Sequence, residues 1–148
     1  MSTKQYIIRQ RRDVDQFRAN DAKYLEYKAD HTELKDNLKS TFAQIQSLAV
    51  DFPDETERQA QLGVLDETMT QLTELIKMNE QETDIYVGTK FREFKARYPG
   101  MLKLFLSGDY DNDAFINALD TLTLLEQGKI NLEQGKEMGY RRYGNQPQ

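Results

Sequence analysis

The sequence contains no cysteine, and His31 is its only histidine. Without thiols the chain cannot form disulfide bridges, thiolate zinc sites or a cysteine nucleophile. A single histidine cannot supply a histidine pair for a metal, and it leaves one possible base for a catalytic triad. We expect His31 to pack within a helix contact. We therefore expect no enzyme activity, no metal and no cofactor.

Long apolar runs are also missing. Near the N-terminus only the pair Ile7-Ile8 stands where a secretory signal needs a longer apolar segment, and no stretch approaches the ~20 residues of a membrane-spanning helix. We expect the chain to stay soluble inside a cell. Its 148 residues, 38% hydrophobic and 30% charged, suit one domain with a thin core.

The charge is unevenly distributed along the chain, whose net charge is -5. The first thirty residues sum to +2 and residues 31–90 to -7. This acidic middle disfavours the whole chain as a nucleic-acid binder, which usually carries a basic stripe. The N-terminal arginines offer a phosphate-binding alternative, although the acidic residues between them favour a solvated or salt-bridged helix start. These arginines are Arg9, Arg11, Arg12 and Arg18.

Glycine and proline are absent between Arg9 and Val50, where apolar residues recur at alternating steps of three and four. This heptad-like seam predicts one helix of about 35–40 residues. Pro53 suits a position at or near the first turn of a second helix, which we expect to end at Gly88. Because the connection is short, the two helices should form an antiparallel hairpin. The predicted seams are Phe17, Asn20, Tyr24, Tyr27, His31, Leu34, Leu38, Thr41, Ile45 and Leu48, then Leu62, Leu65, Met69, Leu72, Ile76, Asn79, Thr83 and Tyr86.

Polar residues interrupt both seams. Such positions lower stability but can fix the register of the two helices, or they can mark where a seam meets another chain. Both interpretations remain open from the sequence. The polar seam residues are Asn20, His31, Thr41, Asn79 and Thr83.

Beyond Gly88 the chain is divided into short segments by proline and glycine. We expect a short helix over 90–97, a second that Pro99 begins and Gly108 closes, and a third over about 112–127. A last short helix should start after Asn131 and run through Tyr143.

The acidic segment 109–113 resembles the start of a calcium loop, with carboxylates at the first, third and fifth positions. The sixth position of such a loop needs glycine for its sharp turn, and this chain has Ala114 there. The segment also precedes an amphipathic helix. We therefore interpret these carboxylates as helix caps.

These patterns predict an all-α fold, with a long coiled-coil-like antiparallel hairpin over 1–88 followed by a cluster of short helices with a polar tail over 89–148. We expect the two parts to form one structural unit. Aromatic and apolar residues of the second part, together with arginine, are the types that dominate protein interfaces. We expect a packed or partner-facing cluster of Tyr98, Pro99, Met101, Leu102, Phe105, Tyr140, Arg141 and Tyr143.

The last third of the chain carries an ordered series of landmarks: a phenylalanine before Tyr-Pro, an S-G-D-Y-D turn, a leucine-rich helix, G-K-I-N and G-Y-R-R-Y. This series resembles a short helical module of small proteins from nucleocytoplasmic large DNA viruses. The N-terminal hairpin lies outside the resemblance. The landmarks are Phe94, Tyr98, Pro99, Met101, Leu102, Gly108, Asp109, Asp111, Leu119, Leu122, Gly128, Lys129, Gly139 and Tyr143.

The resemblance implies a minor capsid protein that lies beneath the major capsid shell and cements or spaces its subunits. Its implied partners are the major capsid protein and other minor capsid proteins, and self-association is compatible with that role. The implied location is the virion, assembled in the host cytoplasm, close to an inner membrane but not inserted in it. Two alternatives remain: an intracellular coiled-coil adaptor, and a nucleic-acid accessory protein that uses the N-terminal arginines.

Overall fold

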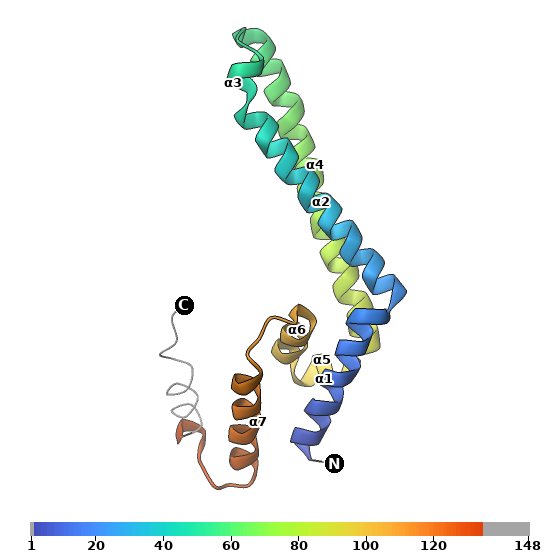
Figure 1. Cartoon of the computed structure of the whole chain (residues 1–148), viewed down its shortest axis with the longest axis vertical. Coiled ribbons are helices and arrows are strands. Elements are labelled where there is room, and N and C mark those ends of the chain that lie inside the picture. The colour runs from blue at the N-terminus through green and yellow to red at the C-terminus, as the bar shows by residue number, and fades with distance from the viewer. Residues whose placement is uncertain (1, 135–148) are drawn as a thin grey trace. The chain divides into compact units, whose positions relative to one another are not determined.

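The computed structural model describes residues 2–134, and every regular element in this part of the chain is an α-helix (Figure 1). The all-α prediction is confirmed for these residues. The helices are α1 (Thr3–Asn20), α2 (Ala22–Gln46), α3 (Leu48–Asp51), α4 (Glu55–Lys90), α5 (Arg92–Arg97), α6 (Pro99–Ser107) and α7 (Asn112–Glu126).

The chain divides into two compact units, and the division differs from the predicted one at residue 88. The first unit combines residues 1–19 with 93–148, and the second consists of residues 20–92. The N-terminal residues belong with the short helices because Ile7 and Val14 of α1 are fully buried. Lys4 of α1 also forms a salt bridge of 2.9 Å with Asp120 of α7.

Asp21 interrupts the helix that the sequence predicted to be continuous, so α1 and α2 are separate elements. Its backbone is extended, with φ -71° and ψ 113°, and its carboxylate accepts a hydrogen bond of 2.9 Å from the amide of Tyr24. An aspartate in this conformation caps the next helix, and its side chain competes with the backbone for the helix's own hydrogen bonds. The expectation of one long helix is therefore wrong at this residue.

The second unit is an antiparallel hairpin of α2 and α4, joined through α3 (Figure 1). Asp54 caps α4 by accepting a hydrogen bond of 3.0 Å from the amide of Glu57, so Pro53 lies just before the helix, close to its first turn. At the other end, α4 continues past Gly88 to Lys90. Gly88 does not end the helix, because its φ is negative like that of any helical residue.

The predicted seams of the hairpin are confirmed from Tyr24 to Leu48 and from Leu62 to Tyr86. Every residue of these two series is buried or half-buried, whereas most residues beside them are exposed. The two earliest predicted members, Phe17 and Asn20, lie in α1 instead. The heptad pattern therefore identified the contact between α2 and α4.

The helix boundaries of the first unit follow the predicted turn residues. Pro99 occupies the first turn of α6, and Gly108 ends that helix with a left-handed φ of 65°. Asp111 caps α7 through the amides of Asp113 and Ala114, at 2.9 and 3.4 Å, and Gly128 follows the helix with φ 70°. The interpretation of this acidic segment as a helix cap is confirmed for Asp111.

The start of the last predicted helix is also present. Asn131 accepts a hydrogen bond of 2.8 Å from the amide of Gln134, and the Gln134 side chain accepts one of 2.9 Å from the amide of Asn131. This reciprocal pair is a capping box. The rest of the predicted helix, through Tyr143, lies outside the described residues.

Candidate protein-interaction surfaces

Three phenylalanines, one from each of the helices α5, α6 and α7, form the centre of the first unit. Phe94 stacks on Phe105 with ring centroids 5.7 Å apart, and Phe115 meets Phe105 edge to face at 5.3 Å. All three side chains are buried. Such geometry adds to the stabilisation that burial itself provides. The short helices therefore share one aromatic core.

The structure separates the predicted interface residues by accessibility. Leu102 and Phe105 are buried and belong to the core. Tyr98 and Met101 are half-buried, and Pro99 is exposed. Only these last three present any surface to a partner. The remaining three predicted residues, Tyr140, Arg141 and Tyr143, lie outside the described part of the chain.

Arg97 joins α5 to α1 through aromatic rings. Its guanidinium lies 4.8 Å from the ring centroid of Tyr6 and 5.4 Å from that of Tyr98. The Tyr6 hydroxyl is buried and has no hydrogen-bond partner among the described residues. Burial raises the pKa of Tyr6, nearby Glu93 adds to the rise, and Arg97 opposes it. With its pKa raised, the Tyr6 hydroxyl stays neutral at ordinary pH.

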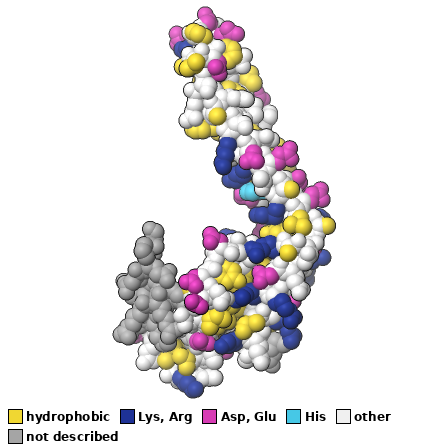
Figure 2. Space-filling model, viewed as in Figure 1, with side chains coloured by type: hydrophobic (Ala, Val, Ile, Leu, Met, Phe, Trp, Pro, Cys, Tyr) yellow, Lys and Arg dark blue, Asp and Glu magenta, His cyan; other side chains and the backbone are white. Residues whose placement is uncertain are grey.

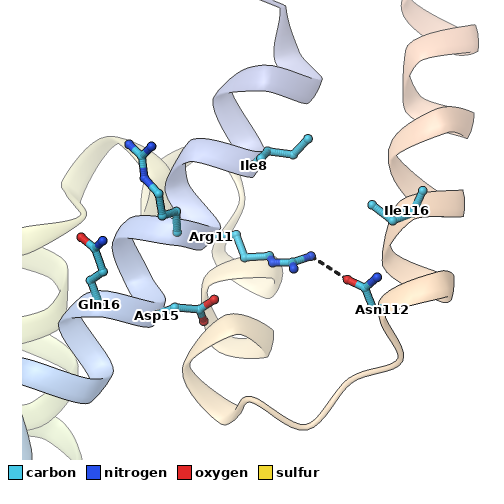
Figure 3. A pocket seen from close by; sticks show the side chains of 7 residues that line it. Ile8, Arg11, Asp15, Gln16, Asn112 and Ile116 are labelled. Carbon is cyan, nitrogen blue, oxygen red and sulfur yellow. Dashed lines mark hydrogen bonds between the residues drawn. The ribbon is translucent and has the colours of Figure 1, made fainter.

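A groove of about 440 Å³ lies between α1 and α7 in the first unit (Figure 3). Ile8 lies on the α1 side and Ile116 on the α7 side, as Figure 3 shows. Arg11 crosses the groove and donates a hydrogen bond of 2.9 Å to the side-chain oxygen of Asn112. The remaining lining residues are Arg12, Asp15 and Gln16. They do not combine a nucleophile with a base.

The N-terminal arginines contribute to the fold of the first unit. The Arg11 guanidinium lies 5.0 Å from the ring centroid of Phe115. Arg18 approaches Asp15 at 4.0 Å and lies against Gly108, where a side chain would collide with its guanidinium. Arg12 approaches Asp13 at 3.7 Å. Arg11, Arg12 and Arg18 therefore make contacts within the first unit. A nucleic-acid interface would need such arginines to be available to phosphates.

Asp21 and Tyr86 link the two helices of the hairpin. The Tyr86 hydroxyl donates to both carboxylate oxygens of Asp21, at 2.8 and 2.9 Å. The ammonium groups of Lys23 and Lys90 lie 5.0 and 5.5 Å from the Tyr86 ring centroid. The amide of Tyr24 is the largest cause that lowers the pKa of Asp21, and the Tyr86 hydroxyl lowers it further. Burial and the hydrogen bond to Asp21 raise the pKa of Tyr86.

Three of the five polar seam residues have hydrogen-bond partners inside the hairpin. Asn79 is buried, and its amide donates a hydrogen bond of 3.2 Å across the seam to the carbonyl of Tyr27. The hydroxyls of Thr41 and Thr83 donate to carbonyls one turn earlier in their own helices. Because Asn79 bonds to one particular residue of α2, it supports the interpretation that a polar seam position fixes register.

One outer face of the hairpin was not recognised in the sequence. Leu75, Met78 and Ile85 form an exposed row on α4, with exposed fractions of 47, 52 and 66%. The signal is visible in the sequence, because these residues recur on one helical face just beside the seam. A shallow cavity of about 360 Å³ runs from this row to α2. Asp30, Glu33, Leu34, Asn37, Leu75, Met78, Asn79 and Glu82 line it.

Acidic side chains also gather at the end of the hairpin where α3 meets α4 (Figure 2). They are Asp51, Asp54, Glu55 and Glu57, all exposed. Across residues 2–134, no three or more His, Asp or Glu side chains are grouped so that they could hold a metal ion. Within the same residues, no helix is both long enough and apolar enough to cross a membrane.

No protein-family model, curated protein or solved structure matches this chain. The resemblance to viral minor capsid proteins stays a prediction.

Proposed function

We propose that this chain is a structural protein without enzyme activity that binds other proteins through its helical surfaces. The observation that carries the proposal is the apolar surface of the hairpin. Among residues 2–134, seven of the ten large hydrophobic side chains that are exposed lie in residues 20–92. Three of them form the row on α4, and grouped apolar side chains on a surface mark an interaction site more often than scattered ones do.

The more specific form of the proposal is a minor capsid protein of a large DNA virus, which cements or spaces subunits beneath the major capsid shell. The landmark series supports it, and Tyr98-Pro99, Gly108 and Asp111 are also the residues that set the helix ends of the first unit. The 36-residue α4 spans about 54 Å, a length suited to a spacer. In a symmetric shell, many weak contacts of this kind would add up through avidity.

Mass spectrometry of purified particles, from the virus that encodes the chain, tests this form of the proposal. We expect the chain to be present in a fixed ratio to the major capsid protein after nuclease and salt washes. Particles of full infectivity that lack the chain would overturn the capsid role.

An intracellular adaptor is the second candidate, and the same exposed row on α4 favours it. The adaptor predicts defined oligomers or complexes in solution without any capsid protein. Light scattering after size exclusion of the purified chain distinguishes the two roles. A nucleic-acid accessory role has less support, because Arg11 and Arg18 make contacts within the first unit.

A further inference from the structure

The apolar row on α4 has an acidic counterpart on α2. Glu26, Asp30 and Glu33 recur at steps of four and three, which places them on one side of α2. Asp30 and Glu33 line the same shallow cavity as Leu75 and Met78. The α2 acidic row, Glu26, Asp30 and Glu33, and the α4 apolar row, Leu75, Met78 and Ile85, therefore form one face of the hairpin.

The cavity between the two rows is lined by carboxylates and by no basic residue. Asp30, Glu33 and Glu82 line the cavity without a basic residue among them, and none of the three forms an ion pair within residues 2–134. The nearest lysine on this side of α2 is Lys23, whose ammonium lies over the Tyr86 ring. The other lysines of α2 fall on the opposite side of the seam by helical periodicity. They are Lys28, Lys35 and Lys39.

A second copy of the chain does not complement this face. In a two-fold dimer the same patch faces itself. The acidic row of one copy would then lie against either the acidic row or the apolar row of the other, and neither supplies a cation. An anionic membrane surface is disfavoured for the same reason. The missing partner must bring apolar side chains and positive charge together.

We propose that this face binds an amphipathic helix of a partner protein. That helix carries apolar side chains at intervals of three and four residues, which contact Leu75, Met78 and Ile85. It also carries lysine or arginine along one edge, opposite Asp30 and Glu33. The apolar row extends over about three helical turns, roughly 15 Å, and the acidic row over about two turns, roughly 10 Å, which suits the helix-in-groove mode of recognition. The inference rests on the proposed function only in taking the partner to be a protein.

Two synthetic helical peptides of about four turns test the partner chemistry. Both peptides carry leucine on one face of the helix. Along one edge of this leucine face, the first peptide carries lysine and the second carries glutamate. Fluorescence anisotropy with the full chain measures their dissociation constants. We expect the lysine peptide to bind at least about tenfold more tightly, and its affinity to fall as salt rises.

Matched variants locate the binding. We expect Asp30→Lys with Glu33→Lys to weaken binding of the lysine peptide about tenfold or more. The control, Asp66→Lys with Glu80→Lys, makes the same change in net charge on the other side of the α4 seam and should stay within about twofold. The double variant Leu75→Glu with Met78→Glu should abolish binding. Its melting temperature, measured by circular dichroism, should stay close to that of the wild type, because both side chains are exposed.

Three results would overturn the inference: equal affinity for the glutamate peptide, equal loss in the control variant, or no measurable binding of either peptide. A dimer of the wild-type chain that Leu75→Glu with Met78→Glu disperses would also overturn it, because a second copy would then be the occupant. These outcomes are independent of the chain's presence in purified particles. Failure of this inference is therefore distinguishable from failure of the capsid proposal.

Discussion

Asp21 both caps a helix and links the two helices of the hairpin. Its carboxylate caps α2 through the amide of Tyr24, and it accepts the hydroxyl of Tyr86 from α4. A helix cap and a contact between helices thus depend on one half-buried carboxylate. Because both interactions favour its charged form, Asp21 is the residue through which pH should most directly affect the hairpin.

Replacing Asp21 with asparagine should reveal this pH dependence. The lowered pKa means that the charged carboxylate stabilises the fold above the usual value of 3.8, and this contribution is lost as pH falls through the folded pKa. Asp21→Asn keeps a capping oxygen but removes the charge. We expect a lower Tm than wild type near neutral pH, and a difference that shrinks below about pH 4.

Circular dichroism melts across this pH range provide the measurement. Asp36→Asn changes an exposed carboxylate of the same helix and serves as the control. A difference between Asp21→Asn and wild type that stays constant down to pH 3 would contradict the account.

Two glycines should respond in opposite ways to alanine. Gly63 lies exposed within α4, and apart from its chain neighbours and the nearby backbone of its own helix no atom lies within 4 Å of where its Cβ would stand. We expect Gly63→Ala to raise the free energy of unfolding by about 0.5–1 kcal/mol.

Gly108 has φ 65°, and its Cβ would meet the Arg18 guanidinium. Gly108→Ala should lower that free energy by about 1 kcal/mol. Urea denaturation measures both, and a stabilising Gly108→Ala would refute the assignment.

At the scale of the elements, substitutions in α6 test the aromatic core most directly. Phe105 is fully buried and contacts the rings of Phe94 and Phe115, whereas its neighbour Leu104 is exposed. Phe105→Ala should cost about 3–5 kcal/mol of stability, and Leu104→Ala less than about 1 kcal/mol. Similar losses in the two variants, measured by denaturant unfolding, would contradict the packing described for α6.

The elements also show how far sequence patterns reach. The seams of α2 and α4 were predictable because burial against one partner helix imposes a heptad spacing. The ends of α6 and α7 were predictable because proline, glycine and Asp111 act on the backbone locally. The break at Asp21 was missed although its cap on the amide of Tyr24 is local; its second partner, Tyr86, lies 65 residues away. The placement of α1 depends on contacts with Asp120 and Asn112, more than a hundred residues along the chain.

The candidate site was less predictable than the fold. Leu102 and Phe105 were predicted to lie in a packed or partner-facing cluster, and they are buried in the core. The sequence did not separate these two positions, because apolar side chains occur both in cores and in interfaces. The α4 apolar row was missed because Leu75, Met78 and Ile85 lie beside a stronger seam on the same helix. Only their exposed surfaces distinguish this row from the contact with α2.

At the scale of the whole molecule, the two units provide different surfaces. Among its described residues, the first unit buries Phe94, Phe105 and Phe115, and the predicted interface residues that remain accessible there are Tyr98, Pro99 and Met101. The second exposes an apolar row beside unpaired carboxylates among the described residues. This distribution supports the proposal that the chain binds other proteins through the hairpin.

Cross-linking mass spectrometry on intact purified particles tests the central claim most directly. Lys103 of α6 and Lys39 and Lys77 of the hairpin are exposed and can react with amine-specific reagents. The capsid account predicts reproducible cross-links from these lysines to the major capsid protein or to other minor capsid proteins. Detection of the chain with cross-links only to itself or to proteins outside the capsid, or its absence from the particle, would contradict that account.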